Sequence, residues 1–209
     1  MGGKVADVME KIKRDLELMR AIMRRMPEIE GVDLQMADGF IMMAPVRPVH
    51  SETIRKALNQ IDDQLPAEQD LAVSSDVEFV WEEWGKDYAP DAIVWEGQAF
   101  RDNLTSASAD LVTFACEVIS PSSVELDYLD KAAAFARVPF AAYLVLDPYV
   151  RRAVLHSQPQ DGIYHLRKIV TYGDPVEIEL PFGTIVLDTS KLPVAPKDEQ
   201  RTEWPKLLP

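Results

Sequence analysis

Three ionisable residues interrupt or border apolar segments in the middle of the sequence. Asp91 opens the stretch DAIVW (91–95), Glu117 lies inside LVTFACEVIS (111–120), and Lys131 falls in the helical pattern after it. A carboxylate in a doubly buried strand is costly unless a partner or ligand offsets its charge. Two carboxylates from adjacent strands can share one divalent cation, because Mg²⁺ favours one or two carboxylates together with carbonyl oxygens and water. A nearby lysine can position the attacking water or balance phosphoryl charge, so the pattern predicts a Mg²⁺ or Mn²⁺ site.

Each of these residues also has a simpler interpretation. Asp91 could cap a turn after Pro90, and Glu117 could pair with an arginine in the core. Asp127 and Lys131 stand four residues apart on one predicted helix. An exposed ion pair at that spacing stabilises a helix by about 0.2–0.5 kcal/mol and needs no catalytic role.

The elements that must position these residues are predicted from the apolar periodicity. Apolar side chains at helical spacing predict a helix over residues 50–65, with Ser51 as its N-cap. Strand 111–120, helix 124–138 and strand 141–146 succeed one another as a right-handed crossover between parallel strands would. Further strands are predicted over 76–81, 91–95 and in four short segments after residue 150. Asp38-Gly39, between apolar stretches, predicts a hairpin within residues 34–46.

This order of elements predicts one α/β (α+β) domain, a mixed central sheet flanked by helices. The domain is expected to cover residues 31–192. An N-terminal amphipathic helix is expected within residues 1–30. Residues 193–209 are polar and rich in proline, and they are expected to form a loosely packed C-terminal tail.

The predicted N-terminal helix, 5–26, has apolar residues at alternating spacings of four and three, which is a heptad seam. The seam consists of Val5, Met9, Ile12, Leu16, Met19, Met23 and Met26. It either packs on the protein's own core or binds a partner, since methionine adapts well to varied surfaces. A homodimer formed through helix 5–26 is therefore one expectation.

Composition and charge narrow the classes of function. The chain has 209 residues, of which 47% are hydrophobic and 27% charged, as in an ordinary globular domain. The sequence contains neither a run of about 20 apolar residues nor a signal-peptide layout. The lone cysteine, Cys116, suits a reducing compartment, so a cytoplasmic location is expected, and strand alternation predicts that its side chain is in the core opposite Glu117. The net charge of −13 weighs against nucleic-acid binding, and no basic stripe is evident.

The ordered motifs PDAIVW, FACEVISPSS and LDYLDKAAAFARVPFAAYLVLDP resemble those of the Uma-type (Uma-two) family of endonucleases. That family belongs to the PD-(D/E)XK, restriction-endonuclease-like superfamily. The resemblance extends from about Gln35 to Leu192. It implies a restriction-endonuclease-like fold and a metal-dependent endonuclease that hydrolyses phosphodiester bonds in DNA.

The resemblance also implies a role for each site residue. Asp91 matches the acid of the family's Pro-Asp motif, and Glu117 matches the second acid of the superfamily core. The superfamily usually has a lysine two residues further on, where this chain has Ile119, and Lys131 on the next helix matches the family's lysine. The backbone carbonyl of Val118 is implied as a further metal ligand.

Three more positions are expected to assist at the site: Gln35, His50 and Ser120. Many relatives have Glu at the position of Gln35, and a glutamine can hydrogen-bond a ligand but adds no charge. His50 is interpreted as structural, whereas Ser120 is expected to end the strand or start the helix through its hydroxyl. Gln35 and the acidic net charge leave an alternative function open, that of an inactive member of the fold that binds or assembles.

Overall fold

The computed structural model of the protein describes residues 47–75, 77–81, 86–138 and 140–201, and two strands within 32–45. Nearer the N-terminus it describes positions 10, 11, 14, 15, 17–19, 21, 22, 25 and 26, of which those up to 22 are helical. The seam residues Val5, Met9, Ile12, Leu16 and Met23 lie outside the described residues. The packing of the heptad seam therefore stays a prediction.

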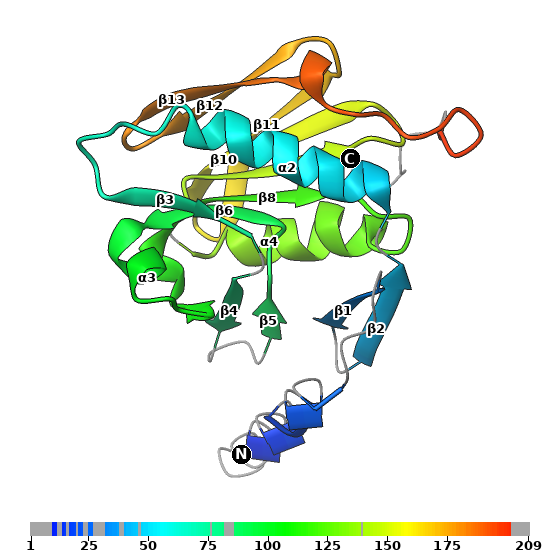
Figure 1. Cartoon of the computed structure of the whole chain (residues 1–209). Helices are drawn as coiled ribbons and strands as arrows, with labels where there is room; N and C mark the ends of the chain where they lie inside the picture. The colour runs from blue at the N-terminus through cyan, green and yellow to red at the C-terminus, as the bar shows by residue number, and fades with distance from the viewer. Residues whose placement is uncertain are drawn as a thin grey trace.

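A six-stranded mixed sheet forms the centre of the molecule (Figure 1). Its spatial order is β11-β10-β9-β8-β6-β3, in which β8 and β9 run parallel and the other neighbours run antiparallel. The strands are β3 (Leu71–Ser74), β6 (Ala92–Glu96), β8 (Val112–Val118), β9 (Ala142–Asp147), β10 (Arg152–Gln160) and β11 (Ile163–Thr171). The predicted crossover between two parallel strands is confirmed, as is the mixed sheet.

Helices connect and cover these strands. They are α2 (Pro48–Asp62), α3 (Gly97–Arg101), η1 (Ala109–Leu111), the π-helix η2 (Leu126–Asp130), α4 (Lys131–Phe135) and η3 (Thr189–Lys191). Helix α2 begins before the predicted N-cap, because Pro48 already has the backbone angle of a first helical residue. The assignment of Ser51 as N-cap was wrong: Ser51 lies in the first turn, and its hydroxyl donates to the carbonyl of Arg47.

Smaller sheets complete the structure. They are the hairpin β1 (Val32–Ala37) with β2 (Phe40–Pro45), the sheet of β4 (Glu78–Trp81), β5 (Lys86–Tyr88) and β7 (Ser106–Ala107), and the hairpin β12 (Pro175–Leu180) with β13 (Gly183–Asp188). The predicted N-terminal hairpin is confirmed, since Ala37 pairs with Phe40. Gln35 stands opposite Met42 in this hairpin, but its side chain lies outside the described part of the chain.

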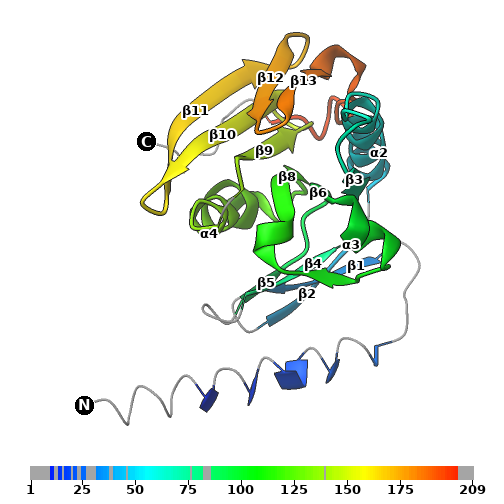
Figure 2. The same cartoon turned by 90° about the vertical axis from the view of Figure 1, so that its left-hand side faces the viewer.

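Both faces of the central sheet are covered, so the sheet separates two apolar cores (Figure 2). Helix α2 and the β12–β13 hairpin pack on one face, against β8 residues that include Cys116. The η2–α4 segment packs on the other face, against Ala115 and Tyr143. Alternation along β8 places Glu117 on the face of Ala115, beneath η2 and α4. The prediction that Cys116 is a core residue opposite Glu117 is confirmed.

The C-terminal segment (residues 193–201) is attached to the domain. The amide of Ala195 donates to the carbonyl of Pro148 at 3.1 Å, and the amide of Arg201 donates to Tyr149 at 2.9 Å. Ala195 is only 1% exposed. The expectation of a loosely packed end was therefore wrong for this segment, because backbone hydrogen bonds and apolar burial hold it against the turn after β9. No helix within the described residues has the length and apolar character that a membrane crossing requires.

Candidate active site at the end of β8

Asp91 and Glu117 meet because β6 and β8 are antiparallel neighbours. Ala92, the first residue of β6, pairs with Cys116 near the end of β8, so the residue before β6 lies beside the last residues of β8. The Asp91 carboxylate accepts a hydrogen bond from the backbone amide of Val118, with 2.7 Å between Oδ2 and the nitrogen. Asp91 thus binds the neighbouring strand and does not act as a simple cap of the turn after Pro90.

Lys131 reaches back over the sheet to Glu117. Its Nζ lies 2.6 Å from Oε1 of Glu117 and 2.9 Å from Oδ1 of Asp127, and the three residues are between 1% and 3% exposed. Two of the simpler interpretations were therefore wrong. Glu117 pairs with a lysine instead of an arginine, and the Asp127–Lys131 pair is buried instead of lying on the surface.

A π-helical turn sets the position of Lys131. Residues Leu126–Asp130 form η2, and α4 begins directly afterwards at Lys131. Such wide turns are rare and occur mostly as single turns inside α-helices, often at functional sites. The Tyr143 hydroxyl from β9 donates to the Asp127 carbonyl at 2.8 Å, which ties the wide turn to the sheet.

Ser120 and Ser123 shape the loop between β8 and the helix. The Ser120 amide donates to Oγ of Ser123 at 3.2 Å, and the two hydroxyls lie 3.0 Å apart. The Ser123 hydroxyl in turn donates to Oδ2 of Asp127. Ser120 therefore acts on the site through Ser123 and Asp127, two residues that the sequence interpretation did not assign to it. The spacing of Ser123, Asp127 and Lys131, four residues each, was the signal that could have identified them.

His50 is brought to the site by α2. It lies in the first turn of the helix, and its Nε2 is 3.2 Å from Oδ2 of Asp91. The two side chains are 17% and 12% exposed, which makes this the most open part of the cluster. The structure thus places His50 in contact with the carboxylate that the sequence assigned to the metal.

The pKa values reflect an excess of carboxylates in a buried place. Burial raises the pKa of Glu117 well above its usual range, and the charges of Asp91 and Asp127 raise it further against the opposing effect of Lys131. Burial also raises the pKa of Asp127. Burial would lower the pKa of Lys131, but the three carboxylates outweigh it and raise that pKa. Burial acts to raise the pKa of Asp91 as well, but the hydrogen bond and charge of His50 lower it overall.

The donor set suits a hard cation that keeps most of its water. Asp91 and Glu117 offer carboxylate oxygens, and their mutual repulsion would be relieved by a positive ion between them. No group of three or more His, Cys, Asp or Glu side chains in the described ranges is arranged to hold a metal by itself. The residues therefore fit Mg²⁺ or Mn²⁺ bound by one or two carboxylates and water, and they do not fit a closed structural zinc site.

The sequence matches one known protein family over most of its length. The model of the Uma2 family, described as "Putative restriction endonuclease", matches residues 22–190. The chain belongs to the Uma2 family. The Uma2 match includes His50, Asp91, Glu117 and Lys131, whereas most of the heptad helix and the whole C-terminal segment lie outside it.

Solved structures contain the same fold as this Uma2 chain. One is the crystal structure of "a putative nuclease belonging to DUF820 from Anabaena variabilis ATCC 29413". The TM-score is 0.56 at 13% sequence identity, over 74% of this chain and 85% of that chain. A likeness at this identity establishes a shared fold and nothing about substrate. None of the curated proteins compared with the Uma2 chain matches it.

Proposed function

We propose that the protein is a metal-dependent endonuclease that hydrolyses phosphodiester bonds in DNA. One observation carries the proposal: Nζ of Lys131 lies 2.6 Å from Oε1 of Glu117. The lysine thus reaches the second acid although it comes from the following helix and not from strand β8. Asp91 is hydrogen-bonded to the residue after Glu117, so an acid, a second acid and a lysine form one cluster. The description of the Uma2 family as restriction endonucleases supports the same reaction class.

Asp91, Glu117 and the backbone carbonyl of Val118 are the residues that would hold Mg²⁺ or Mn²⁺. The bound ion would supply a more acidic water and neutralise charge on the phosphate. His50 orients Asp91 through its hydrogen bond, so that one carboxylate oxygen is fixed by His50 and the Val118 amide. Because both contacts are made to Oδ2, they keep the Asp91 carboxylate in one orientation.

Lys131 is the group that positions water and stabilises developing negative charge. Its raised pKa keeps the ammonium protonated at neutral pH, so it donates hydrogen bonds and does not accept a proton. Asp127 contacts the same ammonium as Glu117, with 2.9 Å between Oδ1 and Nζ. In the proposed reaction, water attacks phosphorus in line and gives up a proton to the surrounding water, the bond from phosphorus to the leaving oxygen breaks, and that oxygen takes up a proton from solvent to become the alcohol.

A cleavage assay tests this assignment. Wild-type protein with Mg²⁺ or Mn²⁺ should cut labelled DNA, and Asp91→Asn, Glu117→Gln and Lys131→Gln should each lower the rate by at least about 100-fold. Arg55→Gln, on the exposed side of α2, is the control and should cut at the wild-type rate. Unchanged cleavage in the Asp91 or Glu117 variant would show that these carboxylates are not the metal ligands.

The burial of the cluster favours one second candidate, a binding or assembly module without catalysis. The side chains of Glu117 and Lys131 are 2% and 4% exposed, as expected of an ion pair that stabilises the fold. Calorimetric titration with Mn²⁺ separates the candidates. Metal binding that is lost in Glu117→Gln supports the endonuclease, and no binding at near-millimolar Mn²⁺ supports the module.

A homodimer through helix 5–26 belongs to this second candidate. Two apolar side chains in the described part of that helix, Leu18 and Ile22, are 61% and 45% exposed. Exposed apolar side chains on an amphipathic helix suit a partner helix. Light scattering tests the dimer: the molar mass should fall to that of one chain after deletion of residues 1–26, and an unchanged mass would exclude this interface.

A further inference from the structure

Positive charge is concentrated in one hairpin of a strongly acidic protein. Residues 151–171, which contain β10 and β11, hold four Lys or Arg and one Asp, a net charge of +3. The whole chain carries −13, so the remainder carries −16. The four basic residues form two adjacent pairs, Arg151-Arg152 and Arg167-Lys168, and all four are exposed. The grouping is not evident in the sequence, because the two pairs are fifteen residues apart. Antiparallel pairing of β10 and β11 brings them together in one hairpin.

The register of the sheet places this hairpin close to the candidate active site. Glu117 on β8 pairs with Val145 on β9, which pairs with Val154 on β10. Two strand spacings, about 10 Å, therefore separate the backbone of Glu117 from that of Val154. Arg152 precedes Val154 by two residues, so it lies on the same sheet face as Glu117, beside the end of β9.

The hairpin continues this positive surface away from the site. His156 pairs with Arg167, which by alternation lies on the same sheet face as Arg152, whereas Lys168, opposite Leu155, lies on the other face. At the turn, a Cβ atom on Gly162 would lie 3.2 Å from the Arg137 side chain, so a further arginine from the end of the α4 segment adjoins the hairpin. Strand β11 is also the outer strand of the central sheet, so its free edge borders no other strand among the described residues (Figure 2).

We propose that the phosphate backbone of a nucleic-acid substrate leaves the Asp91–Glu117–Lys131 cluster and lies against the face of the β10–β11 hairpin that carries Arg152 and Arg167. The inference rests on the proposed endonuclease function, which supplies the reason for a phosphodiester at the cluster. DNA carries one negative charge per about 1.7 Å of duplex axis, so a surface that begins about 10 Å from the site meets several phosphates. The concentration of positive charge in the hairpin gives a protein of net charge −13 one surface to which a polyanion can bind.

Binding measured separately from cleavage tests this inference. The probe is a short fluorescein-labelled DNA duplex, and the background is Glu117→Gln, which leaves the hairpin intact. Fluorescence anisotropy over a range of salt concentrations gives Kd and its salt dependence. Arg151→Gln/Arg152→Gln and Arg167→Gln/Lys168→Gln should each weaken binding by about 10-fold or more at low salt, and each should reduce the slope of log K against log salt by about 1 to 2.

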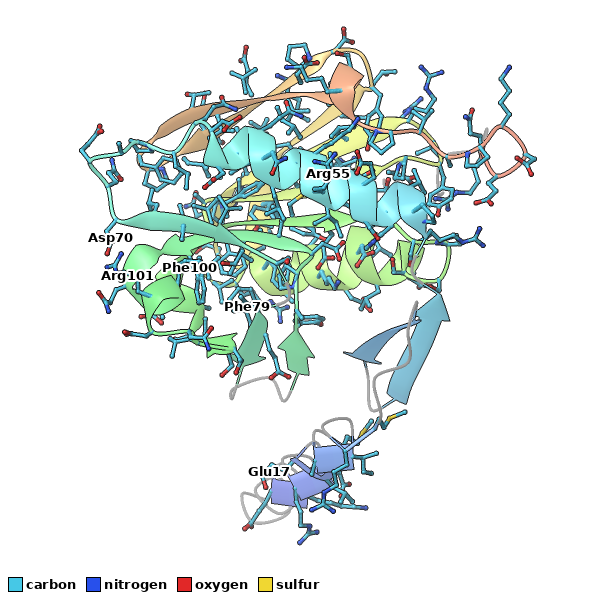
Figure 3. All side chains as sticks on the ribbon, in the orientation of Figure 1. Glu17, Arg55, Asp70, Phe79, Phe100 and Arg101 are labelled. Carbon is cyan, nitrogen blue, oxygen red and sulfur yellow. The ribbon has the colours of Figure 1, made fainter. Side chains whose placement is uncertain are left out.

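The matched control is Arg55→Gln/Arg101→Gln, which also removes two positive charges. Figure 3 shows Arg55 on α2 and Arg101 on α3, and both are exposed and paired with carboxylates, Glu52 and Asp70. Helix α3 comes directly after β6 and lies near β3, at the sheet edge opposite β11. The control should change Kd less than about 2-fold and leave the salt slope unchanged. Each variant removes two positive charges. A difference in Kd between the hairpin variants and the control therefore shows that the position of the charges matters, and not the net charge alone.

The outcomes distinguish this inference from the proposed function. If the wild-type protein cuts DNA but the hairpin variants bind like the control, the hairpin is not the substrate surface and the endonuclease assignment stands. If the hairpin variants lose binding while the wild-type protein shows no metal-dependent cleavage, the surface is supported and the hydrolase assignment fails. Absence of DNA binding by the parent protein overturns the inference.

Discussion

The ammonium group of Lys131 lies 2.6 Å from the carboxylate of Glu117, fourteen residues earlier in the chain and on a different element. Asp127 contacts the same ammonium at 2.9 Å, so a single lysine serves two buried carboxylates. Buried charges of this kind are stable only while each retains its partner. The cluster is therefore both the centre of the proposed chemistry and a point on which the stability of the fold depends.

Removal of the lysine should destabilise the protein strongly. Lys131→Met keeps the length of the side chain but leaves Glu117 and Asp127 without their cation, so the free energy of unfolding should fall by about 3–5 kcal/mol. Urea denaturation monitored by circular dichroism measures the change. Lys131→Arg, which keeps the charge, should lose less. A loss below about 1 kcal/mol for Lys131→Met would show that the carboxylates do not need this partner.

His50 should affect metal binding more than it affects folding. Its hydrogen bond holds Asp91 in one orientation, and loss of such an outer contact typically weakens a metal site about 10- to 100-fold. His50→Ala should therefore raise the Kd for Mn²⁺ by that factor in a calorimetric titration. His165→Ala, on exposed β11, is the matched control and should bind Mn²⁺ like the wild type. Equal affinities of the two variants for Mn²⁺ would show that His50 does not support metal binding.

His156 should make the protein less stable in mild acid. It is 7% exposed and stacks on Tyr143, and burial lowers its pKa to about 4 from the ordinary value of 6.5. Between these values the unfolded chain binds a proton that the folded protein does not bind. The free energy of unfolding should thus fall as the pH falls from 6.5 to 4, by at most about 3 kcal/mol from this residue.

A paired comparison isolates this effect from that of other titrating groups. His156→Phe keeps an aromatic ring between Tyr143 and Tyr164 and removes the titration, so its stability should depend less on pH over that window. His165→Gln removes an exposed histidine and should keep the wild-type dependence. The measurement is urea unfolding at a series of pH values. Parallel curves for the wild type and His156→Phe would contradict the expectation.

Arg201 should anchor the C-terminal segment. Its guanidinium contacts both oxygens of Asp147, a carboxylate that is 0% exposed and that also accepts the Tyr128 hydroxyl and the Tyr149 amide. Arg201→Gln should cost about 1–3 kcal/mol, because the other donors to Asp147 remain and Arg201 itself is partly exposed. Arg201→Lys should lose less. A thermal melt of both variants would detect the difference, and equal wild-type stability would show that Asp147 does not need the arginine.

Local patterns in the sequence were enough to predict much of the fold. The apolar runs of β8 and β9, together with the helical pattern between them, predicted a parallel crossover, which the structure confirms. The proximity of Asp91 before β6 and Glu117 in β8 was likewise predictable, since antiparallel neighbours bring such ends together. Lys131 was identified through the family resemblance, because its contact with Glu117 depends on how the helix crosses the sheet.

The remaining features depend on contacts between distant segments or on small backbone differences. The His50–Asp91 contact needs α2 to cross the end of β6, and the Arg201–Asp147 contact joins residues 54 positions apart. Neither pair leaves a periodic signal in the sequence. The π turn also has no signature in the apolar pattern, since it differs from an α turn by one residue in its hydrogen bonding. The start of α2 was misplaced because Ser51 suggested a cap more strongly than Pro48 suggested a first residue.

The π turn makes the site sensitive to the backbone hydrogen bonding of this segment in a way that its side chains alone do not reveal. Each residue of an α-helix rotates the chain by about 100° around the helix axis, and a π turn accommodates one residue more than an α turn. If Leu126–Asp130 became ordinary α-helix with the same number of residues, the residues before the turn would rotate by roughly that angle relative to the residues after it. Lys131 would then no longer contact both Glu117 and Asp127, although its side chain would still be present. Homologous chains that keep this chemistry should therefore keep the wide turn, whatever residue types form it.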